Sequence, residues 1–236
     1  RATAPEHLTF GLSLEADVRL LERTPGIGGK TELLFHLGER LKKDEREAQV
    51  RVTTSLLGSA AAVNVAAALC GALALLGRPA SGAELQAVAA ALGAVEAVDG
   101  RLKPRTIGKI LVLDDSYNSN PKSVPPALAA AREVAELRDA RFVVALGDML
   151  ELGSRAGQEH QEMVALAANS GAALLILVGE ESGRALGQSS FSTPFHWYPD
   201  SAAAAAALPG LVAPGDVVLV KGSRGVRMER LIESLA

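Results

Sequence analysis

The segment ILVLDDSYNSNP, residues 110–121, consists of an apolar run and a polar turn, and a helical run follows Pro121. We predict a strand over residues 107–113 at its start. The same succession recurs four times. Apolar runs lie at 142–146, 174–178, 195–198 and 217–220, and the helical runs that follow them lie at 158 onward, 182–186, 201 onward and 226–235. Apolar strands separated by helices are typical of a parallel sheet covered on both faces. We therefore predict an α/β fold, a doubly wound Rossmann-like sheet, over residues 100–236.

Residues 1–99 carry a different pattern. The first 57 residues indicate short strands and turns, with partial alternation at 8–12, 17–21 and 48–57. Helices are predicted at 60–76 and 82–92, and Ser81 and Glu84 have the spacing of a capping box at the start of the second helix. Residues 95–100 are a predicted linker. The sequence therefore predicts two domains, 1–99 and 100–236.

The bulk properties exclude several classes of protein. The chain has 236 residues and a formal net charge of −3, so it lacks the basic surface that a nucleic-acid partner requires. The longest apolar stretch, 60–76, contains Asn64 and Gly71, and we predict a buried helix instead of a membrane span. The single cysteine, Cys70, cannot form an internal disulfide, which fits a reducing, cytoplasmic location.

Three polar clusters, residues 114–121, 147–153 and 221–225, follow predicted strands of the second domain. Any one of them could be an ordinary polar turn. In a doubly wound fold, however, ligands bind beyond the carboxyl ends of the strands, where all three clusters would meet. Lys221 and Arg224 suit a phosphate or carboxylate there, and an Asp suits a ribose hydroxyl. Together the clusters predict a nucleotide or anion site.

These clusters also carry a family resemblance. DDSYNSNP, LGDMLELG with the following His160, and VKGSRGVRME resemble DDSYNANP, GDM-x-ELG and KGSR-x-x-x-ME, signatures of the Mur ligases, ATP-dependent amide ligases of bacterial cell-wall synthesis. LTFG at 8–11 resembles a strand of that family's central domain, and Gly100-Arg101 resembles the junction to its C-terminal domain. The resemblance implies that residues 1–99 are the end of the central ATP-binding domain and 100–236 the C-terminal domain.

The resemblance is nearest to the branch of the family that joins D-Ala-D-Ala to UDP-MurNAc-tripeptide. It implies that ATP and Mg²⁺ activate the tripeptide carboxylate as an acyl phosphate, which the dipeptide amine then attacks, with positioning and charge stabilisation supplied by the protein. The sequence has no cluster with metal-ligand spacing, so any Mg²⁺ would depend on the ATP phosphates. The residues that the resemblance assigns are Asn64, Arg101 and Asp115 for the cofactor, Lys221, Ser223 and Arg224 for catalysis, and Tyr117, Asn118, Asn120 and His160 for substrate.

Two features depart from the family. Its G-x-H-N-x-x-N-A-L-A-A segment reads GSAAAVNVAAA at 58–68, with Ala60 and Ala61 at the His and Asn positions. The phosphate-binding loop G-x-x-G-K-T should precede the LTFG strand, whereas GIGGKT at 26–31 follows ERTP and not a buried strand, so we predict a hairpin turn there. We expect the chain to be an incomplete, inactive portion of a longer ligase. Two alternative functions stay open: a non-catalytic nucleotide-binding or interaction module derived from a Mur ligase, and a Mur-type ligase that adds another amino acid. The sequence does not determine the oligomeric state.

Overall fold

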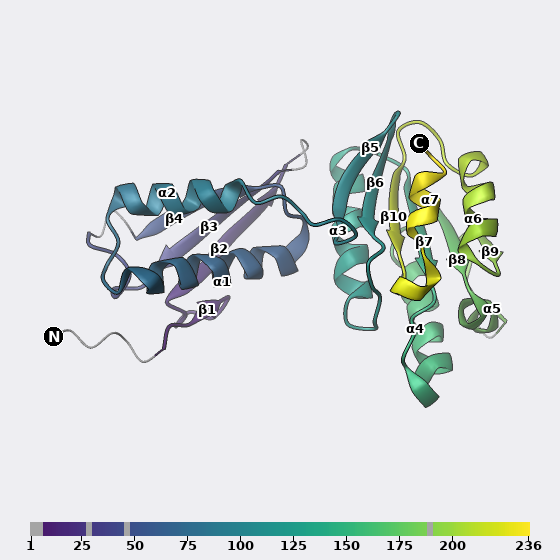
Figure 1. Cartoon of the computed structure of the whole chain (residues 1–236), viewed down its shortest axis with the longest axis horizontal. Helices are drawn as coiled ribbons and strands as arrows, with labels where there is room; N and C mark the ends of the chain where they lie inside the picture. The colour runs from purple at the N-terminus through teal and green to yellow at the C-terminus, as the bar shows by residue number, and fades with distance from the viewer. Residues whose placement is uncertain (1–6, 27–29, 45–47, 188–190) are drawn as a thin grey trace. The chain divides into compact units, whose positions relative to one another are not determined.

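The computed structural model describes residues 7–26, 30–44, 48–187 and 191–236. The chain forms two compact units, residues 1–96 and 97–236 (Figure 1). The boundary between the units falls within residues 95–100, the segment in which the sequence analysis placed a linker.

The first unit contains a four-stranded sheet in the order β1-β2-β3-β4. The strands are β1 (Phe10–Gly11), β2 (Val18–Pro25), β3 (Thr31–Leu37) and β4 (Gln49–Thr54). Strand β1 runs parallel to β2, and the other neighbours pair antiparallel. The sequence analysis missed β3, because Leu34 on its second face interrupts the alternation of the buried Leu33, Phe35 and Leu37.

The predicted hairpin turn at 26–31 joins β2 to β3. Its centre, residues 27–29, lies outside the described residues. The flanks agree with a hairpin, since Pro25 pairs with Thr31 and the Gly26 N–H donates to the Lys30 carbonyl at 2.8 Å. This segment therefore connects two antiparallel strands, and the strand-to-helix setting of a phosphate-binding loop is not present there.

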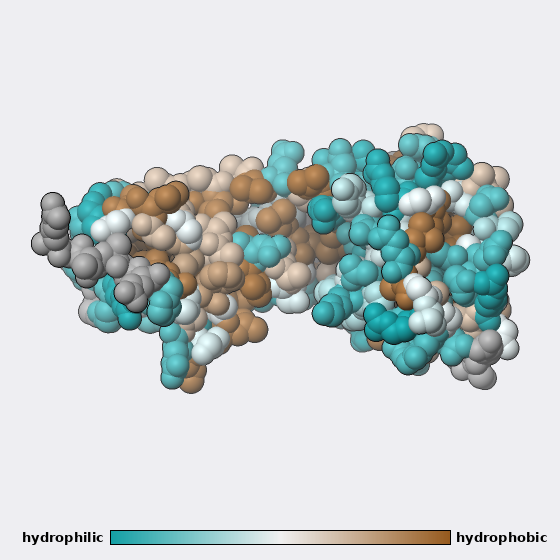
Figure 2. Space-filling model, turned by 60° about the horizontal axis from the view of Figure 1, so that its bottom comes forward, coloured by the Kyte–Doolittle hydropathy of each residue, from teal (hydrophilic) through white to brown (hydrophobic). Residues whose placement is uncertain are grey.

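Helices α1 (Gly58–Leu76) and α2 (Gly82–Gly93) complete the first unit. Leu69 and Leu73 of α1 belong to the same buried cluster as Phe35 of β3, and α2 begins with the predicted capping box. By length and composition alone α1 could cross a membrane, but here one of its faces packs into a core. Its other face is exposed, including Leu75, and Figure 2 shows many apolar side chains on the surface of this unit.

The second unit contains a six-stranded sheet in the order β5-β6-β10-β7-β8-β9. All neighbours pair in parallel except β5 with β6, which confirms the predicted doubly wound sheet. The strands are β5 (Lys103–Ile107), β6 (Ile110–Asp115), β7 (Phe142–Gly147), β8 (Leu174–Val178), β9 (Phe195–Tyr198) and β10 (Val217–Lys221). The strand predicted over 107–113 corresponds to β6, but its start was wrong: a turn with Gly108 at φ 58 separates Ile107 from β6, and Ile107 ends β5, which pairs with β6 as a hairpin.

Helices cover both faces of this sheet (Figure 1). They are α3 (Val124–Leu137), α4 (Ala156–Ala168), α5 (Glu180–Leu186), α6 (Ser201–Ala207) and α7 (Glu229–Glu233). Ala204 of α6 and Leu231 of α7 share one buried cluster with Val143 and Ile176 of the strands. The helix predicted over 226–235 is shorter than expected, because Arg227 has a left-handed backbone with φ 60 between a short 3-10 turn and α7.

Strand β10 lies between β6 and β7, and all three point the same way. Lys221 is therefore in register with Asp115 on one side and with Leu146 on the other. As a result, the polar segments that follow these three strands meet at one edge of the sheet, as the strand-end rule requires.

Candidate active site at the carboxyl edge of the sheet

Lys221 joins the loop after β10 to the loop after β6. Its side chain is 2% exposed, and its Nζ donates to Asp115 Oδ2 at 2.7 Å and to the Asn118 carbonyl at 2.9 Å. Asp115 Oδ1 accepts a further hydrogen bond from the Leu102 N–H at 3.0 Å. The ammonium predicted to be catalytic is thus buried and engaged in this structure, where it holds two loops together.

Ser223 connects all three loops through one hydroxyl. The residue is 3% exposed, and its Oγ donates to the Ser119 carbonyl at 3.2 Å and accepts from the Leu150 N–H at 2.9 Å. The neighbouring Gly222 leaves room for Met228 and for the end of β7, since a Cβ there would lie 2.5 Å from Met228 Cγ and 3.2 Å from Gly147 Cα. Ser223, like Lys221, is therefore a buried residue that fixes the loops at the carboxyl edge of the sheet relative to one another.

Asp148 and His160 hold the loop after β7. The Asp148 carboxylate accepts from the Ser182 N–H at 2.8 Å, from Ser182 Oγ at 2.6 Å and from the Glu181 N–H at 3.0 Å. His160 is fully buried; its Nε2 accepts from the Met149 N–H at 2.9 Å, so the ring proton is on Nδ1, which lies 2.7 Å from the Ala156 carbonyl. The 3.6 Å approach of Nε2 to Asp148 is therefore not an ion pair. This geometry gives His160 a role in shaping the loop and leaves it no surface for a substrate.

Two cationic side chains and one aromatic side chain are accessible together at this edge: Arg101, Arg224 and Tyr117. Tyr117 is 45% exposed, and the Cζ atoms of Arg101 and Arg224 lie 4.5 and 5.6 Å from the centroid of its ring. Within the described residues neither arginine forms an ion pair with an acid. Two guanidinium charges are therefore free to meet an anion beside the buried network.

The predicted asparagines have local roles as well. Asn118 is exposed, and its Oδ1 accepts from the Ser119 N–H at 2.8 Å. Asn120 Oδ1 accepts from the N–H groups of Lys122 and Ser123 at 3.1 and 3.0 Å, in the turn that leads into α3. Asn64 is exposed on α1 of the first unit. The second unit thus brings together nine of the ten predicted site residues, all but Asn64.

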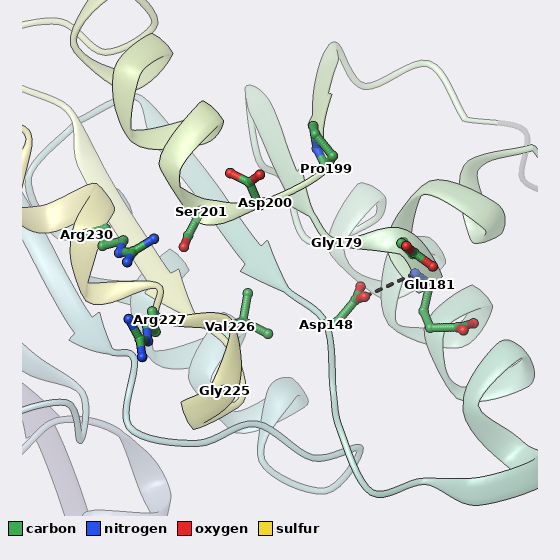
Figure 3. Close-up of a pocket in the computed structure, with 11 residues that line it drawn as sticks. Asp148, Gly179, Glu181, Pro199, Asp200, Ser201, Gly225, Val226, Arg227 and Arg230 are labelled. Atoms are coloured by element: carbon green, nitrogen blue, oxygen red, sulfur yellow. Dashed lines mark hydrogen bonds between the residues drawn. The ribbon is translucent and has the colours of Figure 1, made fainter.

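A pocket of about 590 Å³ opens next to this edge, and the sequence analysis missed most of its lining. Figure 3 shows Arg227 and Arg230 on one side and Asp148 and Glu181 on the other. Asp200 lies between them, with the adjoining Ser201 only 3% exposed. Some missed residues follow β8 and β9, where GEES and PDS succeed the predicted apolar runs, and the strand-end rule applied to these two strands would have found them. The others, Arg227 and Arg230, follow β10 and lie beyond the polar cluster predicted at 221–225.

The comparisons with known proteins agree with this architecture. Residues 100–224 match the family model described as Mur ligase, glutamate ligase domain. The UDP-N-acetylmuramoyl-tripeptide–D-alanyl-D-alanine ligase of Escherichia coli K12 is 36% identical over 157 residues, which are 65% of this chain and 33% of that protein. The enzyme of the same name from Mycobacterium tuberculosis CDC 1551 is 33% identical over 210 residues, which are 80% of this chain and 40% of that protein.

Solved structures give the same result for the fold. Crystal structure I of MurF from Acinetobacter baumannii is similar to 97% of this chain, with a TM-score of 0.76 and 25% identity, over 46% of its own length. MurF ligase from Thermotoga maritima, solved in complex with ADP, has a TM-score of 0.73 and 24% identity over 97% of this chain and 48% of its own. The chain thus spans less than half of each of these relatives. Since the family model matches more than half of the chain and covers the three joined loops, the chain belongs to the Mur ligase family.

Proposed function

We propose that this chain is part of an ATP-dependent ligase that joins D-Ala-D-Ala to UDP-MurNAc-tripeptide through an acyl phosphate. The observation that carries the proposal is the junction of the DDSYN, GDM and KGSR loops by Lys221 and Ser223, next to the unpaired cations Arg101 and Arg224. The similar enzymes from E. coli and M. tuberculosis bear the name of this activity. Because the chain spans only part of those enzymes, the proposal concerns the longer protein.

The charges that line the pocket support D-Ala-D-Ala as the amine substrate. A free dipeptide carries an ammonium at one end and a carboxylate at the other. Arg227 and Arg230 provide the positive side of the pocket, and within the described residues they have no acidic partner. Asp200 provides negative charge: its Oδ1 accepts from two helix N–H groups at 2.9 Å, which leaves Oδ2 for an ammonium. This separation of charge suits a zwitterion of dipeptide size.

The cations at the edge suit the other half of the reaction. Negative charge builds on the acyl phosphate and then on the tetrahedral oxyanion, and fixed guanidinium groups lower the barrier when they stabilise that developing charge. Arg224 is exposed and is held beside Tyr117, so it is available for this role. Lys221 and Ser223 act on catalysis indirectly, by fixing the loop that carries Arg224.

The residues present fit ATP in part. Arg101 offers an unpaired charge for phosphates, and each carboxylate oxygen of Asp115 has one protein donor and keeps a lone pair for a ribose hydroxyl. When bound, ATP would supply the phosphoryl group that activates the carboxylate. In the described parts of the chain, no three His, Cys, Asp or Glu side chains lie close enough to share a metal ion, and we derive no step through Mg²⁺.

Steady-state kinetics of the complete protein test the proposal. Arg227→Gln and Arg230→Gln should each raise the KM for D-Ala-D-Ala by about tenfold, the effect of losing one charge-assisted hydrogen bond, while the KM for ATP changes little. Arg132→Gln is a matched control, since this arginine of α3 is exposed and pairs with Glu136 at 2.6 Å on the surface. A wild-type protein that forms no product from D-Ala-D-Ala, or site variants that match the control, would contradict the proposal.

One observation favours a second function. Ala60 and Ala61 stand where the family has His and Asn, in the helix that carries Asn64. A protein without that pair could bind a nucleotide and lack ligase activity. In that case the complete protein would bind ATP with measurable affinity, and mass spectrometry would detect no amide product.

A further inference from the structure

Tyr117 contacts two guanidinium groups that come from distant parts of the chain. Arg101 precedes β5 and Arg224 follows β10, yet their Cζ atoms lie 4.5 and 5.6 Å from the centroid of the same ring. The face of a tyrosine ring attracts cations at such distances. The ring is therefore the common contact of two positive charges that would otherwise repel each other.

The backbone around Tyr117 is fixed on both sides. Its own N–H donates to the Gly100 carbonyl at 3.0 Å, and the next two carbonyls, of Asn118 and Ser119, accept from the buried Lys221 and Ser223. Its hydroxyl, in contrast, has no hydrogen bond to any described residue. The structure thus holds the ring in place by its backbone, and the part of the side chain that matters is the ring face.

The two arginines have no competing partner among the described residues, and both are exposed. Two adjacent guanidinium groups form a strong anion site only if something keeps them together while the anion is absent. The buried network fixes Tyr117, and the ring then orients both arginines before a ligand arrives. Such preorganisation reduces the conformational entropy that binding must otherwise overcome.

We propose that Tyr117 is a positioning residue that gathers Arg101 and Arg224 into one site for a phosphate-bearing anion. The identity of that anion, the transferred phosphoryl group, rests on the proposed function. The arrangement of Tyr117 with Arg101 and Arg224, called the platform below, does not rest on the proposed function. It follows from the two cation–ring contacts and the fixed backbone.

The test uses the 236-residue chain and inorganic tripolyphosphate as the probe, with affinity measured by isothermal titration calorimetry. Tyr117→Leu should weaken binding by about fivefold, the effect of losing two weak, exposed cation–ring contacts. Tyr117→Phe keeps the ring and should stay within about twofold of wild type, as should Phe195→Leu, which removes an equally exposed ring from β9. Equal affinities for Tyr117→Leu and wild type, or no measurable binding by wild type, would overturn the proposal.

A second readout on the same samples does not depend on ligand. The side-chain Nε–Hε resonances of Arg101 and Arg224, assigned through Arg→Lys variants, should carry a ring-current shift in wild type and in Tyr117→Phe that disappears in Tyr117→Leu. Resonances that are the same in all three proteins would show that the ring does not hold the arginines. If the complete protein fails to use D-Ala-D-Ala while both readouts behave as expected, the proposed function fails and the platform stands.

Discussion

Replacing Lys221 by methionine tests whether this residue is a structural connection between two loops. Methionine keeps most of the volume of the buried stem and removes the ammonium, so packing changes little. The loss leaves Asp115 Oδ2 and the Asn118 carbonyl without the donor that now lies 2.7 and 2.9 Å away. Removing one partner of a buried ion pair costs about 3–5 kcal/mol. Because the Asp115 side chain is 17% exposed and water can reach it, we expect the lower end, about 3 kcal/mol.

Urea unfolding followed by tryptophan fluorescence measures this loss selectively. The only tryptophan of the chain, Trp197, lies in β9 of the second unit, where its Nε1 donates to the Gly179 carbonyl at 2.8 Å. With a slope of about 2 kcal/mol per molar urea, the unfolding midpoint should fall by about 1.5 M. Lys103→Met is the matched control: its ammonium pairs with Asp99 at 2.9 Å on the surface, where such pairs contribute about 1 kcal/mol or less.

Two results would refute this reasoning. One is a midpoint for Lys221→Met that equals that of the control. The other concerns the double variant Lys221→Met/Asp115→Asn, in which the uncompensated carboxylate is also removed. It should be more stable than Lys221→Met alone, because a neutral amide is cheaper to leave partly buried than a charge. If the double variant is less stable by the full cost of both changes, the two side chains are not coupled.

Further outcomes are expected from single changes. Gly100→Ala should lower the free energy of unfolding by about 1 kcal/mol more than Gly108→Ala in the same urea assay: both glycines have positive φ, but only a Cβ at 100 meets Tyr117, at 2.9 Å, and equal losses would contradict this. Hydrogen bonds from Arg78 and Ser81 lower the pKa of Glu84 from 4.5 to about 2. The lowered pKa stabilises the folded state; this contribution is complete above pH 4.5 and is lost as the pH falls toward 2. The melting temperature, followed by circular dichroism, should therefore depend less on pH in Glu84→Gln than in wild type. Parallel curves for the two proteins would exclude this contribution. Arg224→Ala in the complete protein should lower turnover by at least about tenfold with an unchanged melting temperature, and the reverse pattern would make Arg224 a structural residue.

The sheet of the second unit could be predicted from the sequence because its strands are apolar along their length. FVVALG at 142–147 and LLILV at 174–178 are buried on both faces, so they differ clearly from their surroundings. The carboxyl ends of such strands then indicate the site without further information. Strand β3 and the β5–β6 hairpin could not be predicted, because their sequence patterns are irregular. In β3 an apolar residue on the second face interrupts the alternation of apolar and polar residues. At 107–110 a glycine turn between two isoleucines made two strands look like one.

The roles of individual site residues were less accessible, because a sequence does not reveal burial. Lys221 and Ser223 are polar residues in a glycine-containing turn, which in most proteins would face solvent. Here β10 is inserted between β6 and β7, so both side chains point to neighbouring loops and are only 2% and 3% exposed. That insertion depends on contacts between segments far apart in sequence. Arg224, one position further on, is exposed and keeps the role that the resemblance assigned to it as a prediction.

A product analysis with the complete protein that contains this chain tests the proposed reaction itself. Purified protein is incubated with ATP, Mg²⁺, UDP-MurNAc-tripeptide and D-Ala-D-Ala, and the UDP-linked product is identified by mass spectrometry, with free D-Ala and L-Ala-L-Ala as competing amines. We expect the UDP-MurNAc-pentapeptide with equimolar release of ADP and phosphate, and no product from the 236-residue chain alone. ATP consumption without this product, or preferential addition of another amine, would show that the protein does not catalyse the proposed reaction.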